Sequence, residues 1–465
     1  MKSQTSHFTE FKTSKGILLA LIYCLVMALA WQLSGSPIAA LALALLPAGL
    51  VLVVTGHFWF VTLFILFSFF RIHEVVPQLY SFKIPLLLSM AALGGIVWHL
   101  IISRKLVPFW HPSMAWLLLF WGLVTIGIVF ASNRGIAIGN FKGIYWKIIV
   151  MSLAIMWIVN DARQLNKMAV LIALSGMLVG CTALYNSANG IGLVEGTRVT
   201  IGRDIGSMLG DPNDLALVLM FPFAFSLSLL LMPGSHRLIR ALCLVICVVL
   251  LMAVIATQSR GGLLGVLAVS GIFALHFIRN KGLLLFLAGC GALLLYIASG
   301  VSDRASGGAA EEGIDASAMG RLYAWEAAFY MALDNPLTGV GLNNFYFNYF
   351  YYSQHWDGLN HAVHSTWFGV LAETGFLGLT VFICCIVSLL KTARNTIHKI
   401  EKQLHLFEAP VRIVAHAVYA GLVGTVVSGT FLTQGFNWPI YLLGALIVAV
   451  AQIASQIENK NNRNS

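Results

Sequence analysis

Residues 238–257 read LIRALCLVICVVLLMAVIAT, a run of twenty residues in which Arg240 carries the one charge. A helix that crosses a bilayer needs about 20 mainly apolar residues, so this run predicts a membrane-spanning helix. Thirteen further runs of the same kind flank it on both sides. The fourteen runs lie near residues 16–33, 37–55, 57–70, 84–103, 114–131, 145–160, 168–186, 215–232, 238–257, 261–278, 282–299, 366–390, 411–430 and 435–456.

The second and third runs are separated only by Gly56 and His57. Each of them either crosses the membrane or forms a re-entrant or interfacial segment. The first run follows several lysines but has no clear small-residue cleavage site, so we expect a retained span rather than a cleaved signal peptide. The sequence therefore predicts an all-α, polytopic transmembrane helix bundle of 12 to 14 spans.

The composition supports this fold class. The 465 residues are 59% hydrophobic and 10% charged, with a mean hydropathy of +0.85, whereas soluble domains carry about 25% charge. These values exclude a disordered chain, a secreted disulfide scaffold and a nucleic-acid-binding protein. The seven cysteines lie inside apolar runs, without a CxxC or zinc-type spacing, so neither a metal site nor a cofactor is expected.

Basic residues gather on alternate connections between the runs. With a cytoplasmic N-terminus, the inner segments hold 18 of the 28 lysines and arginines. The positive-inside rule then predicts this orientation. Two outer segments are long, at about residues 187–214 and 300–365, and long loops usually carry function.

The second long segment divides into two parts. Residues 302–318 (SDRASGGAAEEGIDASA) are rich in Gly, Ala, Ser and acid, which indicates a mobile stretch. In the following part, Leu322, Trp325, Phe329 and Leu333 recur at helical spacing until Asn335 and Pro336. This pattern predicts an amphipathic helix over 320–334, lying against the membrane or the bundle. We expect three regions: an N-terminal bundle (1–186), a catalytic core (187–390), and a basic loop with a C-terminal helix pair (391–465).

His364 is the first candidate for chemistry. It lies in HAVHSTWFGVLAETG (361–375), where the long outer segment enters an apolar run. Histidine titrates near neutrality, so at a water-accessible membrane mouth it can take a proton from an attacking hydroxyl. A histidine that anchors a helix at the headgroup level fits the same position equally well. His361 is the alternative base.

Two arginines could bind an anion. Arg260 lies in TQSRGG (257–262), a tight outer hairpin between two apolar runs, where it either snorkels outward or holds a phosphate with its planar fork. Arg321 opens the predicted helix, where a cation opposes the helix dipole, so either an anionic ligand or a salt bridge such as one to Glu326 is expected. Together the arginines could clamp a pyrophosphate.

Acidic and aromatic residues surround these candidates. In GDPND (210–214), Asp211 suits a helix N-cap, and Asp214 follows in the first turn. Arg198 and Arg203 precede them, and either attract an anionic lipid or pair with these acids. The aromatic stretch NNFYFNYFYYSQHW (343–356) is typical of a membrane-interface belt and also suits a surface that binds sugar rings or lipid.

Three motifs carry a resemblance to a known family. The order TQSRGGLLGVL, GRLYAWEAAFYMALDNPLTGVGLNNF and HAVHSTWFGVLAETGFLGL resembles the O-antigen ligase superfamily of bacterial membrane proteins, which includes O-antigen polymerases and protein O-oligosaccharyltransferases. The resemblance covers about residues 200–390. Within it, GDPNDLAL (210–217), the GRLxAW helix and HAVHS look most like the exosortase-associated O-glycosylation ligase branch. The N-terminal third is similar only in hydropathy.

The resemblance implies an inverting, metal-independent glycosyltransferase of cell-surface polysaccharide assembly, such as that of lipopolysaccharide. Its donor would be an undecaprenyl-pyrophosphate-linked glycan, and its acceptor a lipid-core or protein hydroxyl, at the periplasmic face of the inner membrane. His364 would be the general base, and Arg260 and Arg321 would bind the pyrophosphate. We expect the substrate to be bound by a further set: Arg198, Arg203, Asp211, Asp214, Trp325 and His361.

Two alternatives remain at this stage. A polymerase of the same fold needs the same base and pyrophosphate clamp, and His364-Ser365, where many ligases have His-Asn, leaves the acceptor open. A transporter of the lipid-linked sugar would favour ionisable residues at mid-membrane and internal repeats. Charge here lies mainly at the ends of the apolar runs and in loops, with Glu373 the one acid well inside a run.

Overall fold

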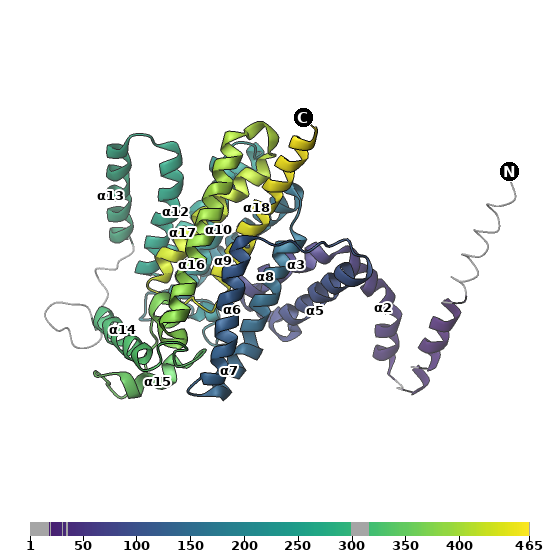
Figure 1. Cartoon of the computed structure of the whole chain (residues 1–465), viewed down its shortest axis with the longest axis horizontal. Helices are drawn as coiled ribbons and strands as arrows, with labels where there is room; N and C mark the ends of the chain where they lie inside the picture. The colour runs from purple at the N-terminus through teal and green to yellow at the C-terminus, as the bar shows by residue number, and fades with distance from the viewer. Residues whose placement is uncertain (1–17, 19, 30, 34–35, 299–315, 465) are drawn as a thin grey trace.

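The computed structural model describes residues 18, 20–29, 31–33, 36–298 and 316–464. In these residues the chain is helical, with no strand and one isolated bridge between Val194 and Arg198. The prediction of an all-α polytopic bundle is confirmed. Figure 1 shows the long helices packed side by side, with the N-terminal helices extending away from the bundle.

Ten helical segments are long and apolar enough to cross a membrane. They are α5 (Ile84–Val97) with η2 (Trp98–Ile102), α6 (Pro112–Phe130), α7 (Arg134–Asn140) with η3 (Phe141–Tyr145) and α8 (Trp146–Ile158), α9 (Ala162–Asn189), α10 (Pro212–Leu231), α11 (Arg237–Ala256), α12 (Arg260–Phe277), α16 (Thr366–Lys402), α17 (Ala409–Gly429) and α18 (Trp438–Asn464). Short helical turns connect them: α4 (Ile72–Val75), η1 (Pro77–Phe82), η4 (Met208–Gly210) and η6 (Leu404–Leu406).

The number of spans differs from the sequence-based range at four runs. The second and third runs form α2 (Pro37–Thr55) and α3 (His57–Phe69), which meet at an angle of 85° and count as one span at most. Gly56 lies at this bend, as expected for the weak separation of the two runs. The run at 16–33 gives the shorter apolar helix Ala20–Leu33, and within α13 (Lys281–Ala298) the apolar helix counted among the described residues, Lys281–Leu294, is also shorter than a span. The described residues therefore hold ten or eleven candidate spans.

The core of the bundle is formed by α10, α17 and α18, the most deeply buried spans. Helix α10 packs against α9, α11, α12 and α17. Its residues are apolar on all sides, as is typical of a helix surrounded by other helices. Helix α16 crosses the bundle beside α6, α17 and α18, and it continues through residue 390, where the second and third regions were expected to meet.

Two further helices, α14 (Ala316–Asp334) and α15 (Phe345–Tyr352), lie at one end of the bundle against the start of α16 (Figure 1). The predicted helix over 320–334 is therefore present, and it ends just before Asn335 as expected. The predicted mobile stretch lies mostly outside the described residues, and its last three positions, 316–318, belong to α14.

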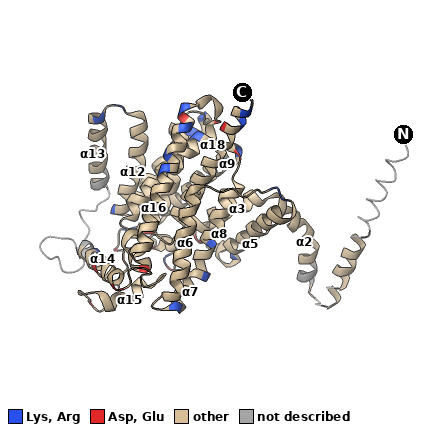
Figure 2. Cartoon of the chain, in the orientation of Figure 1, with Lys and Arg blue, Asp and Glu red and all other residues tan. Residues whose placement is uncertain are grey.

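Figure 2 shows basic residues concentrated at the end of the bundle where α16 and α18 end. This end holds ion pairs between helix termini, including Lys399 with Glu458 and Arg412 with Glu401. Basic residues also lie at the opposite end, near α7. Both ends of the bundle therefore carry basic residues, and these residues are more concentrated at the end where α16 and α18 terminate.

Candidate functional site

His364 lies at a strained turn immediately before α16. Its backbone has a φ of 44°, a conformation uncommon for residues other than glycine, although histidine adopts it more often than most. Such strain costs on the order of 1–3 kcal/mol and persists where neighbouring contacts hold it. Val363 on one side accepts a 3.0 Å hydrogen bond from the Trp325 indole, and Ser365 on the other caps α16. The fold thus presents His364 from a backbone fixed on both sides.

The surroundings of His364 favour its neutral form. Burial lowers its pKa below the usual 6.5, and the positive charge of Arg321 lowers this pKa further. His361 and Arg198 act in the same direction, whereas the negative charge of Asp211 raises the pKa. Four of the residues predicted for the site therefore lie close enough to influence His364 electrostatically. A neutral imidazole at pH 7 can accept a proton.

Helix α14 positions Arg321 and Trp325 beside α16. Its inward face consists of small residues and one methionine: Ala324, Ala327, Ala328, Met331 and Ala332, all buried. The Trp325 ring stacks on Phe368 at a centroid distance of 5.0 Å, which ties the helix to the first turn of α16. Arg321 lies one turn before Trp325 and is partly buried.

The apolar stripe predicted on this helix faces away from the bundle. Leu322, Phe329 and Leu333 are 47%, 43% and 51% exposed, while Trp325 alone of the four turns inward. Of the two expected positions for the stripe, the membrane side fits these exposures. The alanine face makes the contact with the bundle, because small side chains let helix backbones approach closely.

Arg260 is the first residue of α12, directly after a tight turn. Gln258 in this turn has a φ of 50°, and the Ser259 hydroxyl accepts a 3.2 Å hydrogen bond from the Gly262 amide as the N-cap of α12. Arg260 itself is exposed, whereas Gly261 and Gly262 are buried. The hairpin predicted from TQSRGG is thus present, and the helix that it starts presents the guanidinium at its N-terminus.

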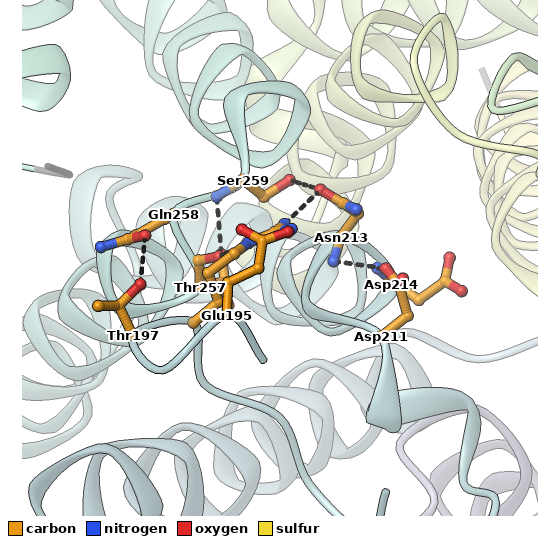
Figure 3. Close-up of polar contacts among 9 residues, drawn as sticks. Glu195, Thr197, Asp211, Asn213, Asp214, Thr257, Gln258 and Ser259 are labelled. Carbon is orange, nitrogen blue, oxygen red and sulfur yellow. Dashed lines mark hydrogen bonds and ion pairs between the residues drawn. The ribbon is translucent and has the colours of Figure 1, made fainter. Parts of the chain in front are cut away.

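Asn213 connects this hairpin to Arg198. Its side-chain oxygen accepts hydrogen bonds from the Ser259 hydroxyl at 2.9 Å and from Arg198 Nη2 at 3.0 Å. Arg198 Nε donates to the Thr257 carbonyl at 3.1 Å, and its Nη1 lies 3.8 Å from the Glu195 carboxylate. Figure 3 shows Asn213 facing Ser259 across this network. Arg198 is 5% exposed, so the network fixes a buried cation beside the α11–α12 hairpin.

The two acids of GDPND have different surroundings. Asp211 is the N-cap of α10, since its carboxylate accepts hydrogen bonds from the Asn213 and Asp214 amides at 2.7 and 3.2 Å. The capping prediction is confirmed, and the same carboxylate also acts on His364. Asp214 accepts a 2.9 Å hydrogen bond from the Gln434 side chain, which comes from the connection between α17 and α18.

Arg203 and His361 lie on exposed or half-buried turns at this end. Arg203 is exposed, and its backbone lies against Gly210. His361 Nε2 lies 2.9 Å from the Asp357 carboxylate, and this hydrogen bond lowers the pKa of Asp357. His361 also packs edge-on against Tyr349 of the aromatic stretch. Both oxygens of Asp357 are within 3.0 Å of that imidazole, so His361 already has a partner.

Comparison with protein families gives one match. Residues 217–383 match the family model described as O-antigen ligase. This match supports the resemblance to the O-antigen ligase superfamily over that part of the chain. A search of curated proteins finds no match. The superfamily implies a membrane glycosyltransferase of the ligase or polymerase kind, acting on a lipid-linked glycan and an acceptor.

The O-antigen ligase match runs from the first turns of α10 into the middle of α16. It includes Arg260, Arg321, Trp325, His361 and His364. The residues Arg198, Arg203, Asp211 and Asp214 precede it. The network around Asn213 therefore joins residues before the matched region to the α12 hairpin within it.

Glu373 has a structural part in this O-antigen ligase domain that the sequence did not reveal. It is 7% exposed, and its carboxylate accepts hydrogen bonds from the backbone amides of Asn343 at 2.7 Å and Phe345 at 3.4 Å. These amides lie at the start of α15, where a carboxylate also interacts favourably with the helix dipole. The single acid inside an apolar run thus anchors the long loop to α16.

The loop docks where α16 is broken. Gly375 has a φ of 68° within α16, and a Cβ there would lie 2.5 Å from the Pro336 carbonyl oxygen. The same carbonyl accepts a 2.8 Å hydrogen bond from the Phe376 amide. Gly339 of the loop, with a φ of 62°, comes equally close to the backbone at Ala372. Glycine is required at both positions because the two backbones touch.

Asn344 completes the docking of the loop. It is fully buried and bonds the connection between α6 and α7, accepting from the Asn133 amide at 3.1 Å and from the Ser132 hydroxyl at 3.2 Å. Sequence reasoning assigned no role to Asn213, Asn344, Glu373 or Gln434. For Glu373 a signal existed, because a lone acid in an apolar run is expected to have a specific partner.

Proposed function

We propose that this chain transfers a glycan from an undecaprenyl-pyrophosphate carrier to an acceptor hydroxyl. The acceptor is a lipid core or a protein, and transfer takes place at the periplasmic face of a bacterial inner membrane. The observation that carries the proposal is the grouping of His364 with Arg321, Arg198 and Asp211 at one end of the bundle. A neutral base with the Arg321 guanidinium beside it is what an acid–base transfer from a pyrophosphate requires, and Arg198 and Asp211 hold their charges near the same base.

In the proposed reaction the acceptor hydroxyl attacks the anomeric carbon of the first sugar. The bond from this carbon to the pyrophosphate oxygen breaks on the opposite face, so the configuration inverts. His364 takes the hydroxyl proton, and the electron pair of the broken bond leaves with the pyrophosphate. The depressed pKa of His364 supports its part as base, because the imidazole is unprotonated at neutral pH before the acceptor binds.

The arginines would stabilise the leaving pyrophosphate. The positive charge of Arg321 lowers the pKa of His364. Arg260 lies at the N-terminus of α12, where backbone amides and the helix dipole favour an anion. Guanidinium groups supply positive charge to the leaving group, so the transfer is proposed to be metal-independent.

The remaining predicted residues would have different parts. Arg203 and His361 are accessible enough to contact a glycan or an anionic lipid. Arg198, Asp214 and Trp325 are engaged by Asn213, Gln434 and Val363, which favours positioning of the site over direct contact. Asp211 combines capping of α10 with an effect on His364.

The proposed orientation follows from charge. The concentration of basic residues at the end where α16 and α18 terminate (Figure 2) favours a cytoplasmic position for that end. His364, which precedes α16, then lies on the periplasmic side. A donor anchored in the bilayer could reach this side while its sugar meets the acceptor in water.

The test is complementation of a gene deletion with wild type or His364→Ala. Glycoconjugates and carrier-linked glycans are then separated by size. A ligase predicts that long polymer accumulates on the carrier, and that mature conjugate is absent, in both the deletion and the mutant. Accumulation of single repeat units would instead assign the polymerase reaction that the superfamily also contains. A normal pattern with His364→Ala, at wild-type protein levels, would overturn the proposed base.

A further inference from the structure

Three helices bring two histidines and a carboxylate together at the opposite end of the bundle. His276 is the penultimate residue of α12, Glu401 is the penultimate residue of α16, and His416 lies in the second turn of α17. One ligand atom of each lies within 4.8 Å of the other two. The proposed glycan-transfer site uses none of these residues.

The geometry within this cluster is compact. His416 Nε2 lies 3.1 Å from Glu401 Oε1, and the rings of His276 and His416 are 4.7 Å apart at an angle of 67°. His416 is buried and Glu401 is half-buried, whereas His276 is exposed. An ion could therefore enter from the aqueous side past His276 and reach ligands that are already convergent.

Arg412 holds the carboxylate in place. Its Nε and Nη2 donate to the two oxygens of Glu401 at 2.7 and 2.9 Å. A carboxylate offers about four lone-pair sites, so this pairing leaves positions on Glu401 for an ion. Carboxylate ligands in metal sites are commonly hydrogen-bonded by a second residue in this way. The ionisable groups that interact electrostatically with His416 are Glu401, Arg412 and His276.

The ligand set selects the ion. Histidine nitrogen and carboxylate oxygen bind Zn²⁺ at about 2.0–2.2 Å, which places neighbouring ligand atoms about 3.3 Å apart in a tetrahedron. The 3.1 Å separation between His416 Nε2 and Glu401 Oε1 is close to this value, and a rotation of the exposed His276 ring would bring the third ligand to the ion. Two imidazoles and one carboxylate suit zinc and similar transition ions better than Mg²⁺ or Ca²⁺.

We propose that His276, Glu401 and His416 bind one Zn²⁺-type ion, with water in the fourth position. The ion ties the end of α12 to the turn between α16 and α17. Because this site lies at the opposite end of the bundle from His364, we assign the ion a structural role. The inference does not depend on the proposed glycan transfer. Without the ion, the contact between His416 and Glu401 is a hydrogen bond within an Arg412-centred network.

The test measures metal content directly. Full-length protein is purified in detergent without a polyhistidine tag, stripped with a chelator, incubated with ZnCl₂, and separated from free ion. Elemental analysis of wild type should give about one zinc per chain. His276→Ala should lose most of this zinc. Because His276 is exposed, the variant is expected to fold. His398→Ala is the matched control. His398 is an exposed histidine of α16 that lies shortly before Glu401 and outside the cluster.

A second measurement distinguishes loss of zinc binding from failure of a variant to fold. Zinc should raise the melting temperature of wild type and His398→Ala but not that of His276→Ala, because a ligand that binds only the folded state stabilises it. Glu401→Gln, which weakens the ligand while keeping its shape, should bind zinc more weakly. Wild-type protein that retains no zinc, or His276→Ala that retains as much as wild type, would overturn the site and leave only the hydrogen-bonded network.

Discussion

The two ends of the helix bundle hold their polar side chains by different means. At the end with His364, side chains bond backbone groups from distant parts of the chain, and Gln258, Asn343 and His364 adopt positive φ. At the other end, carboxylates and cations near helix termini pair directly, as in Arg412 with Glu401 and Lys399 with Glu458. The first arrangement fixes the direction of each side chain, whereas the second ties helices together.

This difference separates activity from stability. Substitutions at the His364 end should reduce transfer strongly, because they alter groups that surround the reacting atoms. Substitutions at the Glu401 end should lower stability while transfer persists.

The largest effect is expected for Arg321→Ala. Removing one group that stabilises developing negative charge typically lowers the rate by about 10²- to 10³-fold. Transfer should be measured in proteoliposomes with a carrier-linked glycan. Arg279→Ala, a substitution just beyond the opposite end of α12, is the matched control and should transfer normally. Equal rates for the two variants would remove Arg321 from the proposed site.

Gly375→Ala should destabilise the docked loop. The added Cβ would meet the Pro336 carbonyl at 2.5 Å in a left-handed conformation, a strain on the order of 1–3 kcal/mol. Thermal unfolding should show a clear decrease in melting temperature together with reduced transfer. Gly271→Ala in α12, where a Cβ has open space, should leave both unchanged. If Gly375→Ala is as stable as Gly271→Ala, the loop does not depend on the break in α16.

Arg412→Met should lower stability without abolishing transfer. The variant loses two charge-assisted hydrogen bonds to Glu401, whose side chain is 25% exposed, and we expect a cost of about 1–2 kcal/mol. Thermal unfolding and transfer in proteoliposomes should be measured on the same preparation. A loss of transfer at temperatures where the variant is fully folded would contradict the division between the two ends.

The smallest effect concerns the pH dependence of transfer. Burial and Arg321 lower the pKa of His364, so the rate should fall on acidification with a midpoint below pH 6.5. Asp211 raises this pKa, so Asp211→Asn, which preserves the N-cap, should move the midpoint to still lower pH. A pH profile of kcat/KM tests both statements. A midpoint that rises in Asp211→Asn would contradict the proposed surroundings of His364.

Much of the fold could be predicted from local pattern. Apolar runs identify the spans, and Asn335 with Pro336 marks the end of α14, because both signals lie within a few residues. The bend at Gly56 was signalled only as a weak separation between runs. The sequence left open whether the apolar stripe of α14 faces the membrane or the bundle, since the choice between alanines and large apolar residues depends on which neighbour lies on each side.

The candidate site was only partly accessible to sequence reasoning. His364, Arg321 and Asp211 could be singled out, because charged and titratable residues at the ends of apolar runs are unusual. Asn213 and Gln434 could not be singled out, because their hydrogen-bond partners lie 46 and 220 positions away along the chain. Polar amides in loops are common, and only the folded structure shows which of them bridge helices.

The break in α16 at Gly375 also bears on how the protein meets bilayers of different thickness. Membrane helices accommodate a thickness mismatch by tilting or kinking. The segment after Gly375 crosses most of the bundle, whereas the short segment from Thr366 to Thr374 is held by the docked loop. Tilting of the long segment can therefore be taken up at Gly375. The position of His364 is then set by the loop, and not by the thickness of the lipid around it.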